Sequence, residues 1–200
     1  MRKKLLIIVV TLLALVALLA GFVAMQPAEF TITRSATIDA PPAEVFKHVN
    51  DLHLWQAWSP WANLDPAAKA TFEGPSAGEG AIFKWSGNDE VGEGSMEIME
   101  SRPNDLIRIK LAFVRPFEDT STSQFEFKPQ GDGTAVTWRM FGRKNFISKA
   151  VCLFMDMDKM LGGQFEEGLA NLDAAVKADQ ANDTPGADDA AESQEDPEET

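Results

Sequence analysis

The longest hydrophobic stretch of the chain lies near its N-terminus. Leu5 to Ala24 is a run of twenty residues without a charge, interrupted only by Thr11 and Gly21. At about 1.5 Å per residue, a helix of this length spans the roughly 30 Å hydrocarbon core of a bilayer. The run therefore predicts a transmembrane helix over 5–24, after a basic segment at 1–4 and before a short linker at 25–29.

A cleaved signal peptide is the competing interpretation of this stretch. Signal peptides usually have an apolar core of about 7 to 15 residues and small residues, spaced as Ala-x-Ala, before the cut. The pairs Leu18/Ala20 and Gly21/Val23 each place a large residue in one of the two small-residue positions. We therefore expect an uncleaved anchor, with cleavage as the alternative.

Basic residues flank only one end of the predicted span. Arg2, Lys3 and Lys4 precede it, whereas residues 26–29 contain no base. The positive-inside rule then places the N-terminus in the cytoplasm. We expect a single-pass protein of the inner (cytoplasmic) membrane whose globular part lies on the periplasmic or extracytoplasmic side.

After the span the hydrophobic period changes to two, which is typical of strands. Apolar residues alternate with Thr and Ser from Phe30 to Ile38 and predict a first strand. The sequence Ala40-Pro41-Pro42-Ala43-Glu44 then opens a short helix that ends near Asn50. A second short helix or helical turn is expected between Leu52 and Leu64.

The middle of the chain predicts strands, and its end predicts one long helix. Clusters of Gly, Pro, Asn and Asp separate six stretches with alternating or β-rich composition. These stretches are 70–72, 81–85, 95–99, 106–114, 123–128 and 134–141. Their spacing favours an antiparallel meander. Apolar residues then mark one face of a helix over about 156–178, and Gly162, Gly163 and Gly168 inside it indicate a kink or a close approach.

Charge is distributed unevenly along the chain. The formal net charge is −13, and residues 178–200 alone contain nine acids and no base. Such a composition cannot bury a core, so we expect 179–200 to be a disordered acidic tail that keeps the domain soluble. Residues 30–178 have the usual size of one domain. The acidic balance argues against a nucleic-acid partner.

The order of elements and three local motifs resemble a known family. The motifs are Ala40-Pro41-Pro42-Ala43-Glu44-Val45-Phe46, Trp55-Gln56-Ala57-Trp58-Ser59-Pro60-Trp61 and Gly133-Thr134-Ala135-Val136-Thr137-Trp138. Together they are similar to the polyketide cyclase/dehydrase-like branch of the SRPBCC superfamily, which shares the START and birch-pollen-allergen fold. The resemblance implies an α+β helix-grip architecture. In it, an antiparallel sheet of about seven strands wraps around the long C-terminal helix, with two short helices after the first strand and an apolar cavity between sheet and helix.

Strand parity, combined with that architecture, predicts which side chains line the cavity. Residues that alternate inward on each strand are large and apolar, whereas their outward neighbours are polar. Large aromatic residues and Met suit an adaptable apolar ligand, although the same side chains could simply fill the core. The predicted lining is Trp58, Phe83, Trp85, Met96, Ile98, Ile109, Leu111, Phe113, Phe125, Phe127, Trp138, Met140, Met157, Leu161 and Phe165.

The three tryptophans of the second motif, Trp55, Trp58 and Trp61, are the most unusual local feature. They could gate the mouth of the cavity or lie at a membrane interface, where amphipathic Trp rings are favoured. Packing of a short helix broken at Pro60 is the interpretation we favour, because Trp is usually well buried.

Signals for catalysis are weak. The histidines, His48 and His53, are five residues apart and do not form a metal-binding pair, so we expect neither a metal nor another cofactor. The sequence contains no nucleophile elbow, phosphate loop or dinucleotide-binding motif. Cys152 lies among apolar residues and is interpreted as a core residue. Arg34, His48, Asp156 and Asp158 are the loose catalytic candidates.

Three functions fit these observations. The first is non-catalytic binding of a hydrophobic small molecule or lipid by a membrane-anchored domain. The second is a cyclase or dehydratase, which the family resemblance permits and which needs a polar group facing the cavity. The third is a membrane-tethered interaction module that binds another envelope protein. The first is the one we favour.

Overall fold

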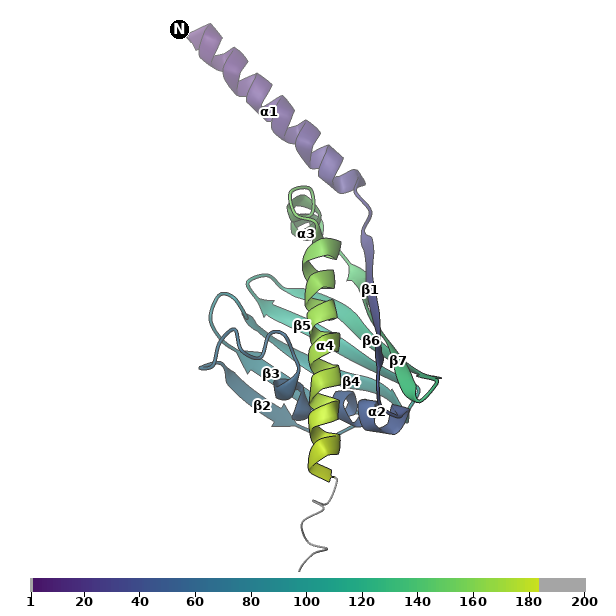
Figure 1. Ribbon diagram of the computed structural model, residues 1–200. Coiled ribbons are helices and arrows are strands. Elements are labelled where there is room, and N and C mark those ends of the chain that lie inside the picture. The colour runs from purple at the N-terminus through teal and green to yellow at the C-terminus, as the bar shows by residue number, and fades with distance from the viewer. Residues whose placement is uncertain (1, 184–200) are drawn as a thin grey trace, which may run out of the picture.

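The computed structural model describes residues 2–183 and consists of one curved antiparallel sheet packed against helices (Figure 1). The helical elements are α1 (Arg2–Met25), α2 (Pro42–Asn50), the 3-10 turn η1 (Leu54–Ala57), α3 (Phe146–Val151) and α4 (Met157–Asp183). The strands are β1 (Glu29–Ile38), β2 (Lys69–Glu73), β3 (Ile82–Ser86), β4 (Glu93–Arg102), β5 (Leu106–Arg115), β6 (Asp119–Gln130) and β7 (Gly133–Arg143).

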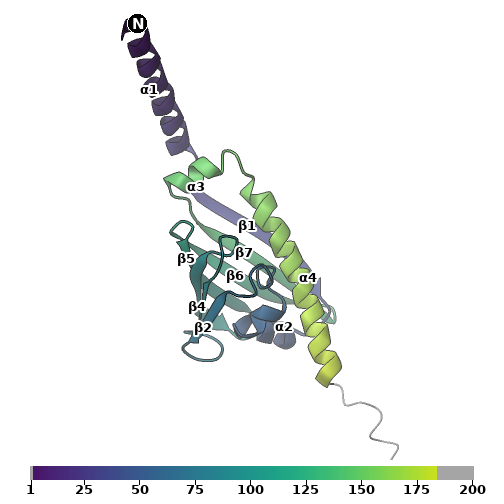
Figure 2. The same ribbon diagram turned by 90° about the vertical axis from the view of Figure 1, so that its left-hand side faces the viewer.

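The sheet is a meander closed by the first strand. Its order is β1-β7-β6-β5-β4-β3-β2, and every pair of neighbours is antiparallel. Strands β2 to β7 therefore follow one another in space as in sequence, and β1 pairs with β7. Helix α4 runs along one face of the sheet, and α2 lies at one end of the same side (Figures 1 and 2). This is the predicted helix-grip arrangement.

The predicted elements are found with shifted ends. All seven strands are present, and several are longer than the alternation indicated; β4, for example, extends to Arg102. Helix α4 continues to Asp183, five residues beyond the predicted end. The six-residue helix α3 was not predicted. Asn145 caps it, because the Asn145 side chain accepts a hydrogen bond from the Ser148 backbone N–H at 2.8 Å. The remainder of the predicted acidic tail, 184–200, lies outside the described residues.

The motif tryptophans are packed into the domain. Trp55 and Trp58 are buried, and their indole N–H groups donate to the carbonyl oxygens of Val49 (2.9 Å) and His48 (3.1 Å). Trp61 is partly buried and donates to Gln164 Oε1 at 2.8 Å. The cluster thus ties η1 and the loop after it to α2 on one side and to α4 on the other, which agrees with the packing interpretation.

Two glycines of α4 allow close approach to the sheet. An added Cβ at Gly168 would lie 2.8 Å from Cζ3 of Trp138, and one at Gly162 would lie against the Arg34 guanidinium. Gly163, by contrast, has nothing within 4 Å of that position. The close approach of α4 to the sheet therefore explains Gly162 and Gly168, but not Gly163.

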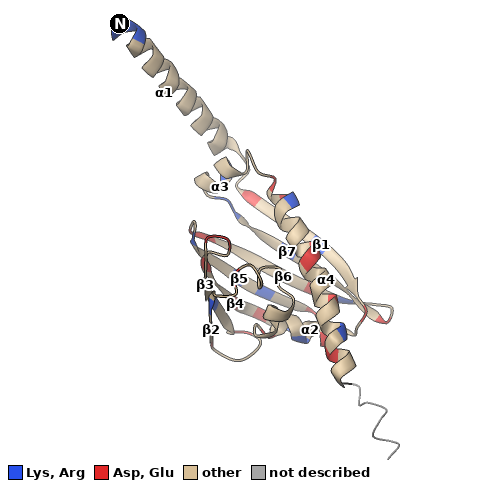
Figure 3. Cartoon of the chain, turned by 60° about the vertical axis from the view of Figure 1, so that its left-hand side comes forward, with Lys and Arg blue, Asp and Glu red and all other residues tan. Residues whose placement is uncertain are grey.

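Helix α1 extends away from the domain (Figures 1 and 2). It is 24 residues long with a mean hydropathy of 3.1 over its most apolar part, which makes it long and apolar enough to cross a bilayer. Apart from the basic residues of its first turn it carries no charge (Figure 3). Its side chains are almost all exposed, and Val23 near its C-terminal end is the exception.

Candidate functional site: an apolar cavity

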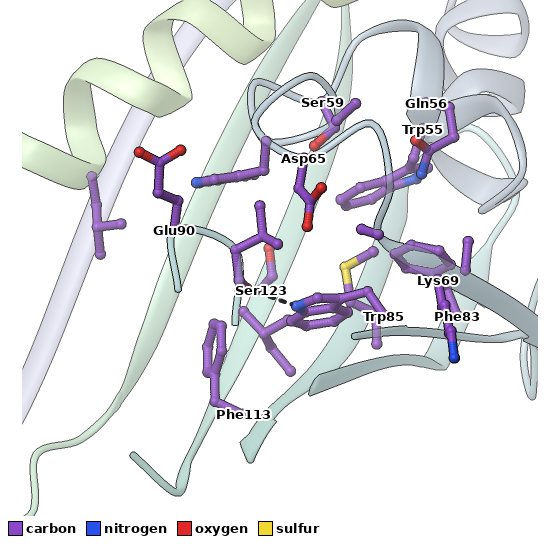
Figure 4. Close-up of a pocket in the computed structure, with 18 of the residues that line it drawn as sticks. Trp55, Gln56, Ser59, Asp65, Lys69, Phe83, Trp85, Glu90, Phe113 and Ser123 are labelled. Atoms are coloured by element: carbon purple, nitrogen blue, oxygen red, sulfur yellow. Dashed lines mark hydrogen bonds between the residues drawn. The ribbon is translucent and has the colours of Figure 1, made fainter. Parts of the chain in front are cut away.

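A cavity of about 350 Å³ lies between the sheet and α4. Its floor consists of side chains from β3 to β7, and α4 contributes Leu161 and Phe165. The loop after η1 and the turn between β3 and β4 complete the wall. In Figure 4, Phe83, Phe113 and Ser123 extend from strands, whereas Ser59 and Asp65 come from the loop. The volume falls in the range of about 300–1,000 Å³ typical of small-molecule sites.

Nine of the fifteen side chains predicted to line the cavity do so. They are Phe83, Trp85, Met96, Leu111, Phe113, Trp138, Met140, Leu161 and Phe165. They come from four strands, β3, β4, β5 and β7, and from α4, as strand parity and helix periodicity indicated. Whether they contact a ligand stays a prediction.

The other six predicted side chains do not reach the cavity. Trp58, Ile98, Ile109, Phe125 and Phe127 are at most 2% exposed and lie in the hydrophobic core instead. Met157, the first residue of α4, also lies outside the lining, because the cavity wall on this helix begins one turn later, at Leu161. Parity identifies the inward face of a strand, but it does not show where along that face packed core gives way to open space.

The loop half of the lining was missed. The residues not predicted include Trp55, Ser59, Trp61, Ala62, Asp65, Pro66, Ala68, Ala70 and Val91. The tryptophan motif was the one available signal for this part of the wall. The alternative in which this motif gates the mouth of the cavity brings Trp61 near the cavity, but Trp61 is not in the predicted lining.

One wall of the cavity is a rigid aromatic stack. Trp138 and Phe165 lie parallel with ring centroids 4.1 Å apart and an interplanar angle of 6°. Trp61 meets both rings edge-on. The Trp138 indole N–H donates to Ser123 Oγ at 2.8 Å, so its polar atom is satisfied inside the wall. This side of the cavity consequently presents ring faces and edges, a surface suited to apolar ligands.

Asp65 fixes the loop that closes the cavity. Its Oδ1 accepts from the Ala67 N–H at 3.0 Å and its Oδ2 from the Asn88 N–H at 2.7 Å. Asn88 belongs to the β3–β4 turn, and its own side chain accepts from the N–H groups of Glu90 and Val91. One carboxylate thus ties the loop after η1 to the turn opposite, and both segments line the cavity.

The loose catalytic candidates lie outside the cavity. Arg34 extends from β1 to α4, where its Nε is 2.7 Å from Glu166 Oε1 and its Nη2 is 3.2 Å from Asp158 Oδ2. Both carboxylates raise the pKa of Arg34, so this group acts as a fixed cation that aligns α4 on the sheet. The carboxylate of Asp156 accepts from the Lys159 N–H at 3.1 Å and so caps the start of α4.

His48 is the one buried titratable side chain among these candidates. It is 3% exposed, and its Nε2 lies 3.3 Å from Oδ2 of Asp179 at an angle outside the range of a hydrogen bond. Burial lowers the pKa of His48 below its ordinary value of 6.5, although Asp179 acts in the opposite direction. The residue packs between α2 and the C-terminal half of α4. It does not line the cavity.

Solved structures share this fold at low sequence identity. A protein of unknown function from Staphylococcus aureus, SA2116, aligns over 76% of this chain and 96% of its own with a TM-score of 0.58 and 10% identity. Protein MLL2253 from Mesorhizobium loti aligns over 74% of this chain and 98% of its own, with a TM-score of 0.55 and 17% identity. The Aha1 dimer from Colwellia psychrerythraea aligns over 74% of this chain and 96% of its own, with a TM-score of 0.51 and 16% identity. These values establish similarity of fold alone.

Comparison at the level of families is more specific. No functionally curated protein matches the chain. The family model described as "Polyketide cyclase / dehydrase and lipid transport" matches residues 29–177, which is the globular part from the start of β1 almost to the end of α4. With the helix-grip fold and the cavity between sheet and helix, this match shows that the chain belongs to the polyketide cyclase/dehydrase and lipid transport family.

Proposed function

We propose that this protein is a membrane-anchored binding domain that holds a hydrophobic small molecule or lipid in the cavity, without catalysing a reaction on it. The observation that carries the proposal is the cavity itself: about 350 Å³, with walls that are mostly aromatic and aliphatic. Family members include proteins of lipid transport, which agrees with such cargo. Apolar walls bind by burial of surface and need few directed hydrogen bonds.

Polar side chains are a minority of the lining, and two of them are already held by the protein. Asp65 accepts from two backbone N–H groups, and Ser123 accepts from the Trp138 indole. The other polar side chains of the lining are Gln56, Ser59, Lys69 and Glu90. The candidates Arg34, His48, Asp156 and Asp158 lie elsewhere. A cyclase or dehydratase needs an acid or base directed at its substrate, and a binding protein does not.

Anchoring is the second part of the proposal. We infer that α1 stays attached and spans the inner membrane with Arg2, Lys3 and Lys4 in the cytoplasm, so that the domain lies on the extracytoplasmic side. Extraction of membranes with alkaline carbonate should leave the full chain in the pellet at its uncleaved mass. Release of a shorter chain would identify α1 as a signal peptide.

Native mass spectrometry of the full chain purified from membranes tests the ligand. We expect a reproducible apolar adduct that organic solvent extracts. Phe113→Arg places a charge in the cavity wall and should abolish the adduct, whereas Met99→Arg, on an exposed face of β4, should retain it. An empty wild-type protein, or equal adducts on both variants, would contradict binding in this cavity.

A further inference from the structure

A second apolar surface lies outside the cavity, at the end of the domain next to α1. It comprises α3, the segment that follows it and the first turn of α4. Its exposed members, which we call the α3 surface, are Phe146, Ile147, Val151, Phe154, Met155 and Met160. Phe154 is 85% exposed. Contiguous large apolar side chains in contact with water are unfavourable and mark an interface with another molecule or with a membrane.

The α3 surface adjoins the end of the candidate membrane span. Helices α1 and α3 are in contact, and both views show α3 beside the C-terminal end of α1 (Figures 1 and 2). Lys149 Nζ donates to the carbonyl oxygen of Ala24 at 3.1 Å, and the Lys144 N–H donates to that of Ala28 at 2.6 Å. These bonds hold the α3 surface at the level where α1 ends.

Charges in the same segment favour an anionic environment. Residues 143–160 contain four bases, Arg143, Lys144, Lys149 and Lys159, and two acids, Asp156 and Asp158. Asp158 is paired with Arg34, and Asp156 caps the start of α4. Apolar side chains interspersed with bases are the composition of segments that lie in the headgroup region of anionic bilayers.

The α3 surface and the cavity lining include neighbouring residues of α4. Leu161, which lines it, directly follows Met160 of the α3 surface. Phe113, also in the lining, directly precedes Val114, whose side chain is exposed.

We propose that the α3 surface lies in the headgroup region of the bilayer that holds α1, so that the domain contacts lipid next to the turn of α4 at which the cavity wall begins. The inference rests on the anchor of the proposed function. Its specific content is a second membrane contact made by the domain itself, with anionic lipid as the partner.

The single cysteine allows a direct test, because Cys152 is the C-cap residue of α3 and is partly exposed. The full chain, labelled there with the fluorophore NBD, is reconstituted into phosphatidylcholine vesicles with and without phosphatidylglycerol. We expect the emission to be several-fold brighter than in water and shifted to shorter wavelength, and the effect to be larger with phosphatidylglycerol. In a Cys152→Ser background, a label at Ser76→Cys lies on the exposed β2–β3 turn, and its emission should remain the same as in water.

Variants separate the α3 surface from the anchor. Ile147→Glu combined with Phe154→Glu should return the Cys152 label to its emission in water, while Met99→Glu, an exposed apolar residue on β4, should not. All variants should still resist carbonate extraction. A water-like label on a chain that resists extraction would overturn the α3 proposal alone, whereas release by carbonate would overturn the anchor. A label shielded in native membranes but not in protein-free vesicles would assign the surface to a protein partner instead.

Discussion

At the scale of single residues, His48 shows what burial does to a titratable group that lies outside the cavity. The ring is enclosed between α2 and α4, and Asp179 compensates only in part for the loss of water. The pKa of His48 is therefore lowered from 6.5. In the folded protein the neutral ring is favoured, and protonation opposes the packing of α4 on α2.

This lowered pKa predicts how stability depends on pH. Well above pH 6.5 the ring is neutral in both folded and unfolded chains, and its contribution is complete. As the pH falls through 6.5 toward the lower pKa of the folded state, the unfolded chain binds the proton more readily, so stability is lost. His48→Leu should flatten this part of the curve. Thermal unfolding followed by tryptophan fluorescence between about pH 5 and 8 measures it.

A companion variant checks the cause. Asp179 raises the pKa of His48, so Asp179→Asn should lower it further and extend the loss of stability to more acidic pH. If His48→Leu and the wild type lose stability with the same slope below pH 6.5, another group is responsible for the acid sensitivity.

At the scale of elements, the packing of α4 on the sheet depends on residues without side chains. Gly168 faces Trp138, whose ring is stacked against Phe165 and held at its indole N–H by Ser123. A ring fixed in this way cannot move aside for a new methyl group. Pro60 Cδ lies 3.2 Å from the Cβ that would be added at Gly168, so the new methyl group has no free space on that side either.

Gly168→Ala should therefore destabilise the domain by roughly 1–3 kcal/mol through overpacking. Gly163→Ala is the matched control: it makes the same change five residues earlier in α4, where an added Cβ meets nothing within 4 Å. It should stabilise the domain by roughly 0.4–1 kcal/mol, because alanine restricts the unfolded chain. Thermal melting of both variants decides the point, and equal shifts would show that Gly168 is not tightly packed.

Prediction from sequence succeeded for elements with a regular period. Alternation identified all seven strands, and the 3.6-residue period identified α4. Helix α3 has six residues, too few for a period to repeat, and its cap at Asn145 was not recognised. The same limit applies to the cavity. The strand and helix walls followed from periodicity, whereas nothing in the local sequence of 59–70 shows that this loop folds over β3 and reaches the β3–β4 turn through Asp65.

At the scale of the whole molecule, the apolar surface and the C-terminal end of α4 lie at opposite ends of the domain. Helix α1 and the α3 surface form one end, and the C-terminal end of α4 lies at the other (Figure 2). Acidic side chains are frequent along α4 (Figure 3). The buried core contributed by α4 ends at Val176.

A chain that ends at Asp183 should consequently keep the stability of the full protein and the proposed contact of the α3 surface with lipid. The buried side chains that α4 places against the sheet all precede that point. We expect the melting temperature to be unchanged and the NBD emission at Cys152 to be the same in phosphatidylglycerol vesicles. A lower melting temperature would show that residues 184–200 contribute contacts of their own to the domain.

The length of α4 also separates two electrostatic environments. Its 27 residues span about 40 Å, whereas the Debye length at physiological ionic strength is about 8 Å. The far end of α4 is thus several screening lengths from the α3 surface. Acids in the last turns of α4, such as Asp179, and the bases beside α3, Lys144 and Lys149, therefore act on their surroundings independently of one another. The length of one helix keeps a cationic and an anionic end of the same domain electrostatically separate.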